Sequence, residues 1–183
     1  MSRILILFAT VDGQAAHVAA RIGANLAQSG HEIATRPVDA PGLAQAIAEC
    51  DAVIVGGAIR FGRHVRNIES HVRDHIAAIS ARPNAFFSVS LSGGGPGARP
   101  ETASGYVVTF CARTGWHPQA TAIFGGALRY TKYNVFIRFM MRLIVGIAGG
   151  DTDTSRDYEY TDWRAVERFA AEFAAQFHSA RAA

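Results

Sequence analysis

The sequence predicts an α/β fold, an open, doubly wound parallel sheet of five strands in the order 2-1-3-4-5. Apolar runs without alternation occur at residues 4–8 and 51–57, and such runs are typical of parallel strands covered on both faces. Segments with apolar residues at helical spacing separate the runs. In such a sheet the ligand crevice lies at the carboxyl ends of the first and third strands.

The first half of the chain contains two strands and two helices. The first strand is expected over residues 4–8, and a helix follows that ends near Ser29 and Gly30, because glycine suits the left-handed backbone at a helix C-terminus. The second strand is expected over residues 31–38, followed by a weak helix over 41–49. With the strand at 51–57 these elements form two successive βαβ units.

The second half continues the alternation of strand and helix. The expected elements are a turn over 60–63, an amphipathic helix over 65–79, a strand over 84–91, a glycine-rich loop over 92–100, a helix that includes 106–113 and a strand over 118–124. Thr161 and Asp162 are of the type that caps a helix, and the last helix follows them. A chain of 183 residues is short for two domains, so we expect one domain over residues 1–183.

The composition excludes several classes of protein. With 49% hydrophobic and 18% charged residues the chain is neither disordered nor fibrous. The net charge of +3 permits an anionic ligand or a membrane surface, but no lysine and arginine block interleaved with aromatics points to nucleic acid. Cys50 and Cys111 lack CxxC spacing, which favours reduced thiols in the cytoplasm. His71 and His75 have no evident third ligand, so we expect no metal site.

An insertion at about residues 126–160 exceeds what a minimal domain of this class needs. Its middle, residues 133–148, is apolar around most of a helix, with a polar ridge that includes Arg138 and Arg142. A helix of about 16 residues is roughly 24 Å long, shorter than the ~30 Å hydrocarbon core, so we expect it to lie on a membrane surface rather than to cross it. The alternative is an extra helix that packs on the sheet or in an interface between two copies of the chain.

The turn after the first strand suits a phosphate group. Backbone N–H groups and the positive end of a helix converge there, outside the carboxyl end of the strand. Thr10, Asp12, Gly13 and Gln14 add hydroxyl, carboxylate and amide groups to the turn. A plain βα turn is the alternative.

Six segments of the chain resemble a known family. They are residues 6–14, 57–62, 126–130, 138–144, 149–154 and 160–163. The sheet order and the first loop resemble flavodoxin-like FMN-binding proteins, and nearly the whole chain resembles the menaquinone-dependent protoporphyrinogen IX dehydrogenases of bacterial haem synthesis. The segments in the insertion are the most specific, because an ordinary flavodoxin lacks them. The first loop departs from the family at Ala9 and Ala15, where hydroxyl residues are usual.

The resemblance implies an FMN-dependent enzyme that oxidises protoporphyrinogen IX to protoporphyrin IX in haem biosynthesis and passes electrons to a membrane quinone. It also implies a cytoplasmic location with peripheral attachment to the inner membrane, with residues 133–148 on the membrane. A flavodoxin-type electron carrier or quinone reductase, which docks a protein partner through the insertion, is the alternative. A flavin-free interaction domain is a third possibility, supported by Ala9 and Ala15.

The resemblance also assigns candidate site residues. Those expected to hold FMN are Thr10, Val11, Asp12, Gly13, Gln14, Ala58, Ile59, Arg60, Phe61, Gly62, Leu91, Ser92, Gly93 and Gly94. A glycine lets the backbone approach the flavin ring, an aromatic side chain covers its face, and a cation favours the reduced, anionic flavin.

A basic and aromatic face on or beside the insertion is the candidate substrate or membrane face. It comprises Arg129, Tyr130, Tyr133, Arg138 and Arg142. Arginines there would pair with the two propionates of a tetrapyrrole or with anionic lipid headgroups. No residue stands out as a catalytic acid or base.

Overall fold

The computed structural model describes residues 1–182, without the side chains of residues 66 and 177–182, so Ala183 lies outside the described residues. Within the described part, the central sheet has five parallel strands in the order β2-β1-β3-β5-β6. They are β1 (Arg3–Ala9), β2 (Glu32–Pro37), β3 (Ala52–Arg60), β5 (Asn84–Ser90) and β6 (Ala120–Gly125). The predicted order is confirmed, because β4 (Arg63–His64) is only the hairpin partner of β3.

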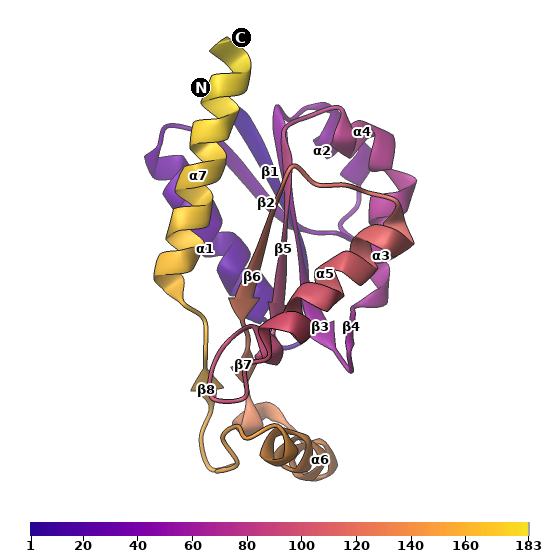
Figure 1. The fold of residues 1–183 in the computed structure, drawn as a ribbon. Helices are drawn as coiled ribbons and strands as arrows, with labels where there is room; N and C mark the ends of the chain where they lie inside the picture. The colour runs from indigo at the N-terminus through magenta and orange to yellow at the C-terminus, as the bar shows by residue number, and fades with distance from the viewer. Residues whose placement is uncertain (183) are drawn as a thin grey trace.

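Helices cover both faces of the sheet (Figure 1). The helices α1 (Gln14–Gln28) and α7 (Trp163–Ala182) cover one face. The opposite face carries α2 (Leu43–Ala48), α3 (Arg66–Asp74), α4 (Ile76–Ser80) and α5 (Pro100–Thr114). This is the layered arrangement that the alternation of strands and helices predicts.

The strand β1 shows why a central parallel strand needs no alternation of apolar and polar residues. Ile4 and Ile6 lie in the core shared with α1 and α7, whereas Leu5 and Leu7 lie in the core shared with α3 and α5. All four side chains are at most 2% exposed. Each contributes about 1.5–3 kcal/mol of burial free energy, so β1 anchors both cores and fixes the loop that follows it.

The helix expected over residues 65–79 is interrupted. It ends at Asp74 and restarts at Ile76, because His75 has φ −121° and ψ 14°. The Nδ1 atom of His75 contacts the carbonyl oxygen of His71 at 2.9 Å, and the backbone N–H of His75 donates to Val72 instead. His71 makes the same kind of contact with the Asn67 carbonyl oxygen inside α3 without a break, so the interruption lies in the backbone angles of His75 itself.

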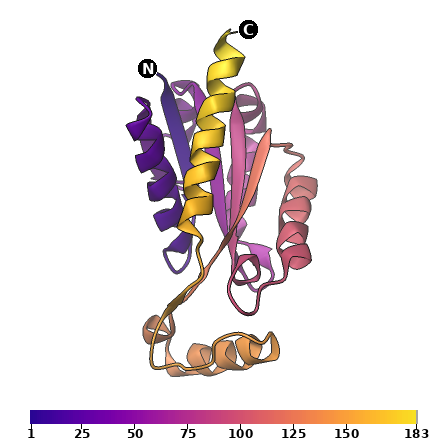
Figure 2. The same cartoon turned by 60° about the vertical axis from the view of Figure 1, so that its left-hand side comes forward.

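The insertion forms a small unit at the carboxyl end of the sheet (Figure 2). It contains β7 (Ala127–Leu128), the 3₁₀ turn η2 (Tyr130–Lys132), α6 (Val135–Ile147) and β8 (Tyr158–Glu159), which pairs antiparallel with β7. Leu128, Tyr130 and Val145 form its own buried cluster. The helix predicted within residues 133–148 is therefore present, and it lies across the end of the sheet rather than against one of its faces.

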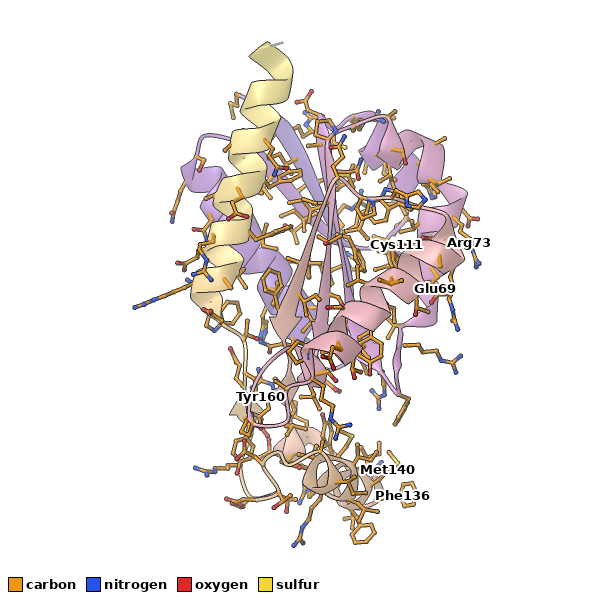
Figure 3. The ribbon with its side chains drawn as sticks, viewed as in Figure 1. Glu69, Arg73, Cys111, Phe136, Met140 and Tyr160 are labelled. Atoms are coloured by element: carbon orange, nitrogen blue, oxygen red, sulfur yellow. The ribbon has the colours of Figure 1, made fainter. Side chains whose placement is uncertain are left out.

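The outer side of α6 is apolar and exposed. The side chains that point outward are Val135 (83% exposed), Phe136 (76%), Phe139 (67%), Leu143 (58%) and Ile147 (77%), which we call the α6 face. Figure 3 shows Phe136 and Met140 on α6, at the end of the molecule away from the sheet. In the described part of the chain no helix has the length and apolar character needed to cross a membrane.

Candidate functional site

Three neighbouring cavities lie between the carboxyl edge of the sheet and the insertion. The inner cavity, about 50 Å³, is lined by Thr10, Val11, Asp12, Gln14, Ala58, Ile59, Arg60, Val89, Ser90, Leu91, Gly126 and Ala127. The middle cavity, about 230 Å³, is lined by Asp12, Ile59, Arg60, Phe61, Gly62, Ser90, Leu91, Ser92, Tyr106, Ala127, Tyr133, Ile137, Met141 and Ile144. The outer cavity, about 340 Å³, lies beyond the middle one. The inner and middle cavities share residues from all three predicted loops.

The loop after β1 leaves donors free for an anion. Gly13 has φ +90°, which is a left-handed backbone, and its N–H donates to the Thr10 hydroxyl oxygen at 3.0 Å. No side chain caps α1, so the backbone N–H groups of its first turn have no intrahelical partner. These donors and the positive end of the helix suit a phosphate at the inner cavity.

The two alanines that depart from the family pattern are packing residues. Ala9 is 2% exposed and Ala15 is fully buried, and their methyl groups lie in the two cores on opposite faces of the sheet. Neither side chain supplies a donor, so the Thr10 hydroxyl and the backbone N–H groups remain for the phosphate. This donor set fits an FMN phosphate through the backbone more than through side chains.

The turn expected over residues 60–63 is a tight hairpin between β3 and β4. Arg60 pairs with Arg63, and Phe61 and Gly62 both have positive φ, at +50° and +78°. Positive φ at both central residues defines a type I′ turn, which a phenylalanine enters only with strain. Phe61 is 66% exposed beside the middle cavity, and the Arg60 guanidinium lies 5.3 Å from its ring centroid. The fold therefore holds an exposed aromatic ring beside the middle cavity, which can stack on a planar ligand.

Asp12 joins three segments of the site. Its carboxylate lies 3.8 Å from Arg60 Nη1 and accepts a hydrogen bond of 3.3 Å from the Tyr133 hydroxyl. Burial, with the nearby Asp12 charge, raises the pKa of Tyr133 to about 12. Tyr133 therefore stays protonated at neutral pH and acts as a donor between the insertion and the first loop.

A second set of bonds ties the insertion to α1. Arg129 Nη2 donates to the Gln14 side-chain oxygen at 3.0 Å and to Glu159 at 3.3 Å. The Gln14 amide nitrogen donates to the Thr161 hydroxyl at 2.8 Å, and that hydroxyl donates to the Gly125 carbonyl at 2.7 Å. Gln14 thus lines the inner cavity while both ends of its amide hold the insertion in place.

The residues of the loop after β5 have two different roles. Leu91 and Ser92 line the middle cavity, but Gly93 and Gly94 serve close packing. A Cβ atom at Gly93 would lie 2.5 Å from the Phe124 carbonyl oxygen, and one at Gly94 would lie 2.7 Å from the Tyr160 carbonyl oxygen. Gly94 lines the outer cavity instead of the middle one. These glycines let the loop lie directly against the chain that enters and leaves the insertion.

The expected basic and aromatic face is divided by the structure. Tyr130 is fully buried, and its hydroxyl donates to the Asp151 carbonyl at 2.9 Å. Arg138 donates to the carbonyl oxygens of Tyr130 and Tyr133, so its guanidinium stabilises the start of α6. Tyr130 therefore does not lie on that face, Arg142 is exposed on α6, and Tyr133 faces the middle cavity.

Sequence reasoning missed several residues of the middle cavity. Ser90 is 4% exposed, and its hydroxyl oxygen has no hydrogen-bond partner within the described part of the chain. A hydroxyl at the carboxyl end of a buried strand was the signal for it, since a buried hydroxyl needs a partner and a flavin ring edge would provide one. Tyr106 and the inner side of α6 also line the cavity, through Ile137, Met141 and Ile144.

The fold and the cavities define a flavodoxin-type flavin-binding protein. A family model described as a flavodoxin domain matches residues 5–155, and the chain belongs to this family. The structure of oxidised flavodoxin 2 from Bacillus cereus aligns with a TM-score of 0.59 at 17% identity, over 96% of this chain and 100% of that chain. FMN is the cofactor that this family and the geometry of the inner and middle cavities indicate.

The branch of the family is also defined. Protoporphyrinogen IX dehydrogenase [quinone] of Escherichia coli strain K12 is 34% identical over 172 residues, which cover 94% of this chain and 94% of that protein. The protein of the same name from Leishmania major is 34% identical over 174 residues, 94% of this chain and 75% of that protein. This chain is thus a member of the branch that contains the quinone-type protoporphyrinogen IX dehydrogenases, which are oxidoreductases.

Proposed function

We propose that this protein is an FMN-dependent dehydrogenase that oxidises protoporphyrinogen IX to protoporphyrin IX in haem biosynthesis and passes the electrons to a membrane quinone such as menaquinone. One observation carries the proposal furthest. The insertion roofs the middle cavity with Ile137, Met141 and Ile144, opposite the Phe61 hairpin. An apolar roof over a flavin ring suits a flat, apolar macrocycle, and a protein that only exchanges electrons at an exposed ring edge has no need of it.

The residues of the site have roles that follow from their contacts. FMN, when bound, would accept two electrons from the macrocycle in each cycle, as one hydride equivalent, while a second proton leaves the macrocycle. Arg60 places a cation beside the ring position and Phe61 offers a face for stacking. Burial raises the pKa of the Tyr133 hydroxyl to about 12, so this group stays protonated at neutral pH and does not accept the proton. Water is therefore the proton acceptor that we propose.

The overall reaction needs three cycles. Conversion of the porphyrinogen to the porphyrin removes six electrons and six protons, and each quinone that becomes a quinol takes up two of each. The balance therefore requires three quinones for each porphyrin. Because every cycle returns the flavin to its oxidised form, the product that accumulates is the porphyrin.

We further propose that the protein lies on the cytoplasmic side of the inner membrane, with the α6 face in the headgroup region. The exposed Phe136, Phe139 and Ile147 support this, since a patch of large apolar side chains on one helix is typical of an interfacial anchor. Arg142 is exposed beside the patch and suits anionic headgroups. A second copy of the chain, which would make a homo-oligomer, is the competing occupant of this face.

A flavodoxin-type electron carrier or quinone reductase is the second candidate. The exposed ring of Phe61 and the α6 face favour it, because both could contact a protein partner. The net charge of +3 speaks against the ordinary carrier, which tends to be acidic.

The proposal is tested anaerobically with the FMN-loaded protein. Protoporphyrinogen IX and a menaquinone analogue are added, and porphyrin fluorescence is followed against a sample without protein. Growth of emission that depends on both protein and quinone is the expected result. Binding of FMN without porphyrin formation would contradict the dehydrogenase and favour the electron carrier.

A further inference from the structure

We infer that the outer cavity is the quinone site, in which the quinone ring lies beside the flavin position and its isoprenoid tail leaves toward the α6 face. The inference rests on the proposed function, which supplies the quinone as electron acceptor. The cavity, of about 340 Å³, lies between the loop after β5, the first turn of α5 and the C-terminal half of α6. Cavities of this size hold small organic ligands.

The outer cavity adjoins the position of the flavin ring. It shares Leu91, Ser92, Tyr106 and Ile144 with the middle cavity. A ligand in the outer cavity is therefore separated from the middle cavity by single side chains. That proximity is what electron transfer from a reduced flavin to a second substrate requires.

The outer cavity also reaches the α6 face. Ile144 and Ile147 line the cavity, and they are 47% and 77% exposed on α6. A lipid-soluble ligand could therefore enter from the surface that we propose lies on the membrane, without crossing water. The middle cavity does not include Ile147 in its lining, so the route leads through the outer cavity.

Small residues open this space. Gly94, Gly97, Ala148 and Gly150 all line the outer cavity. The loop after β5 and the end of α6 approach closely here, since a Cβ atom at Gly97 would lie 3.4 Å from the Ala148 carbonyl oxygen. Larger side chains at these positions would fill the cavity or push the two segments apart.

The lining favours a quinone over the porphyrinogen. Most of the side chains are apolar, and Ser92, Thr102 and Tyr106 add hydroxyls that can donate to quinone carbonyl oxygens. Arg99 is the single cation among the described residues that line the cavity. The porphyrinogen carries two propionates, and each would need a cationic or donor partner. The chemistry of the lining therefore matches a neutral acceptor of hydrogen bonds.

The step at this site is a two-electron reduction. The quinone accepts two electrons from the reduced flavin and two protons, and it leaves as the quinol while the flavin returns to its oxidised form. The protons come from the reduced flavin and from water at the cavity mouth. The hydroxyl groups hold the carbonyl oxygens in place and are not consumed.

The test fills the outer cavity from α5. Thr102 is exposed, lines the outer cavity and does not line the middle one, so Thr102→Trp adds an indole without altering the flavin position. Thr109→Trp is the matched control, because Thr109 is exposed on the same helix two turns later and lines none of the three cavities. The FMN-loaded proteins are reduced with one equivalent of dithionite, so that none remains to reduce the quinone, and are mixed anaerobically with a menaquinone analogue while flavin reoxidation is followed.

The expected result is a loss of about tenfold in reoxidation rate for Thr102→Trp and a change within about twofold for Thr109→Trp. A photoreactive naphthoquinone should also label the wild type within residues 91–106 or 141–150, and Thr102→Trp should lose this label. Unchanged reoxidation together with labelling elsewhere would overturn the inference. Slower reduction by protoporphyrinogen IX, with normal quinone reoxidation, would assign the cavity to the macrocycle and overturn it as well.

Two features keep the test decisive. Dithionite replaces the porphyrinogen as reductant. The rate of flavin reoxidation by the quinone can therefore be interpreted even if the protein does not oxidise protoporphyrinogen IX. If Thr102→Trp does not fold or bind FMN, Ala148→Leu fills the same cavity from the end of α6. The photolabelling of the wild type needs no variant at all.

Discussion

The Tyr133 hydroxyl donates a hydrogen bond of 3.3 Å to the Asp12 carboxylate, across 121 residues of sequence. The bond connects the insertion to the loop that is expected to hold the FMN phosphate. Arg60 lies 3.8 Å from the other oxygen of the same carboxylate. The β3–β4 hairpin is therefore linked, through Asp12, to both the first loop and the insertion. The cofactor site and the insertion are therefore one structural unit.

Removing this hydroxyl should weaken FMN binding more than it weakens the fold. For Tyr133→Phe we expect a loss of about fivefold in FMN affinity, because one hydrogen bond contributes about 1 kcal/mol. The measurement is an FMN titration followed by flavin fluorescence. Tyr158→Phe is the control, since the Tyr158 hydroxyl accepts from Arg156 on the outer side of the insertion. Equal affinities for both variants would contradict the role of Tyr133.

Phe61 should lower the stability of the FMN-free protein and strengthen the binding of FMN. Phe61→Gly relieves the backbone strain at φ +50°, so the FMN-free protein should gain about 0.5–1 kcal/mol in its free energy of unfolding. FMN affinity should fall, because the variant lacks the stacking ring. Phe61→Ala also removes the ring but keeps the strained backbone, and it should lose affinity without the gain in stability. Denaturant unfolding of both FMN-free variants measures the difference, and equal stabilities would rule out strain.

Acid should destabilise the protein through His64. This imidazole is 3% exposed, contacts the Ser88 hydroxyl at 3.0 Å, and burial lowers its pKa to about 4. Below pH 6.5 the unfolded chain binds a proton at His64 that the folded protein does not, so stability falls as the pH drops from about 6.5 to about 4. From pH 7 to pH 5 this histidine should cost about 2 kcal/mol.

The variant His64→Gln isolates this contribution. The difference in unfolding free energy between pH 7 and pH 5 should shrink by about 2 kcal/mol, whatever the absolute stability of the variant. An undiminished acid sensitivity in His64→Gln would show that other groups cause it.

The α6 face should control membrane attachment. We expect the double variant Phe136→Glu and Phe139→Glu to lose sedimentation with vesicles of anionic phospholipid, because both side chains are more than 60% exposed on one side of the helix. Val108→Glu is the control, since Val108 is 68% exposed on α5, away from this face. Retained sedimentation of the double variant would contradict the membrane proposal. If the wild type is an oligomer in solution and the double variant has the mass of a single chain, the α6 face is instead an interface with a second copy.

Much of the fold could be predicted because it depends on local patterns. The uninterrupted apolar run at residues 4–8 requires cover on both faces, and that requirement indicates a central strand of a parallel sheet. The three loops at its carboxyl edge follow from the topology. The break at His75 did not follow from apolar spacing, because it lies in the backbone angles of one residue between two helical segments that share the same apolar face.

The side of α6 that lines the middle cavity could not be predicted from the sequence, for a different reason. The helix α6 is apolar around most of its surface, so spacing alone did not show that Met141 and Ile144 face the sheet while Phe136 and Phe139 face away. The buried position of Tyr130 is likewise decided by long-range packing with Tyr158 and Val145. The extent of the domain and the role of each site residue in binding FMN stay predictions.

The most direct test of the proposed dehydrogenase activity is a single anaerobic reaction without quinone. Stoichiometric protoporphyrinogen IX is mixed with the FMN-loaded protein, and the visible absorption of the flavin is followed, with the product protoporphyrin IX as control. We expect rapid bleaching of the flavin by the porphyrinogen alone, and its recovery when a menaquinone analogue is added. A flavin that stays oxidised in the presence of porphyrinogen would contradict the dehydrogenase activity.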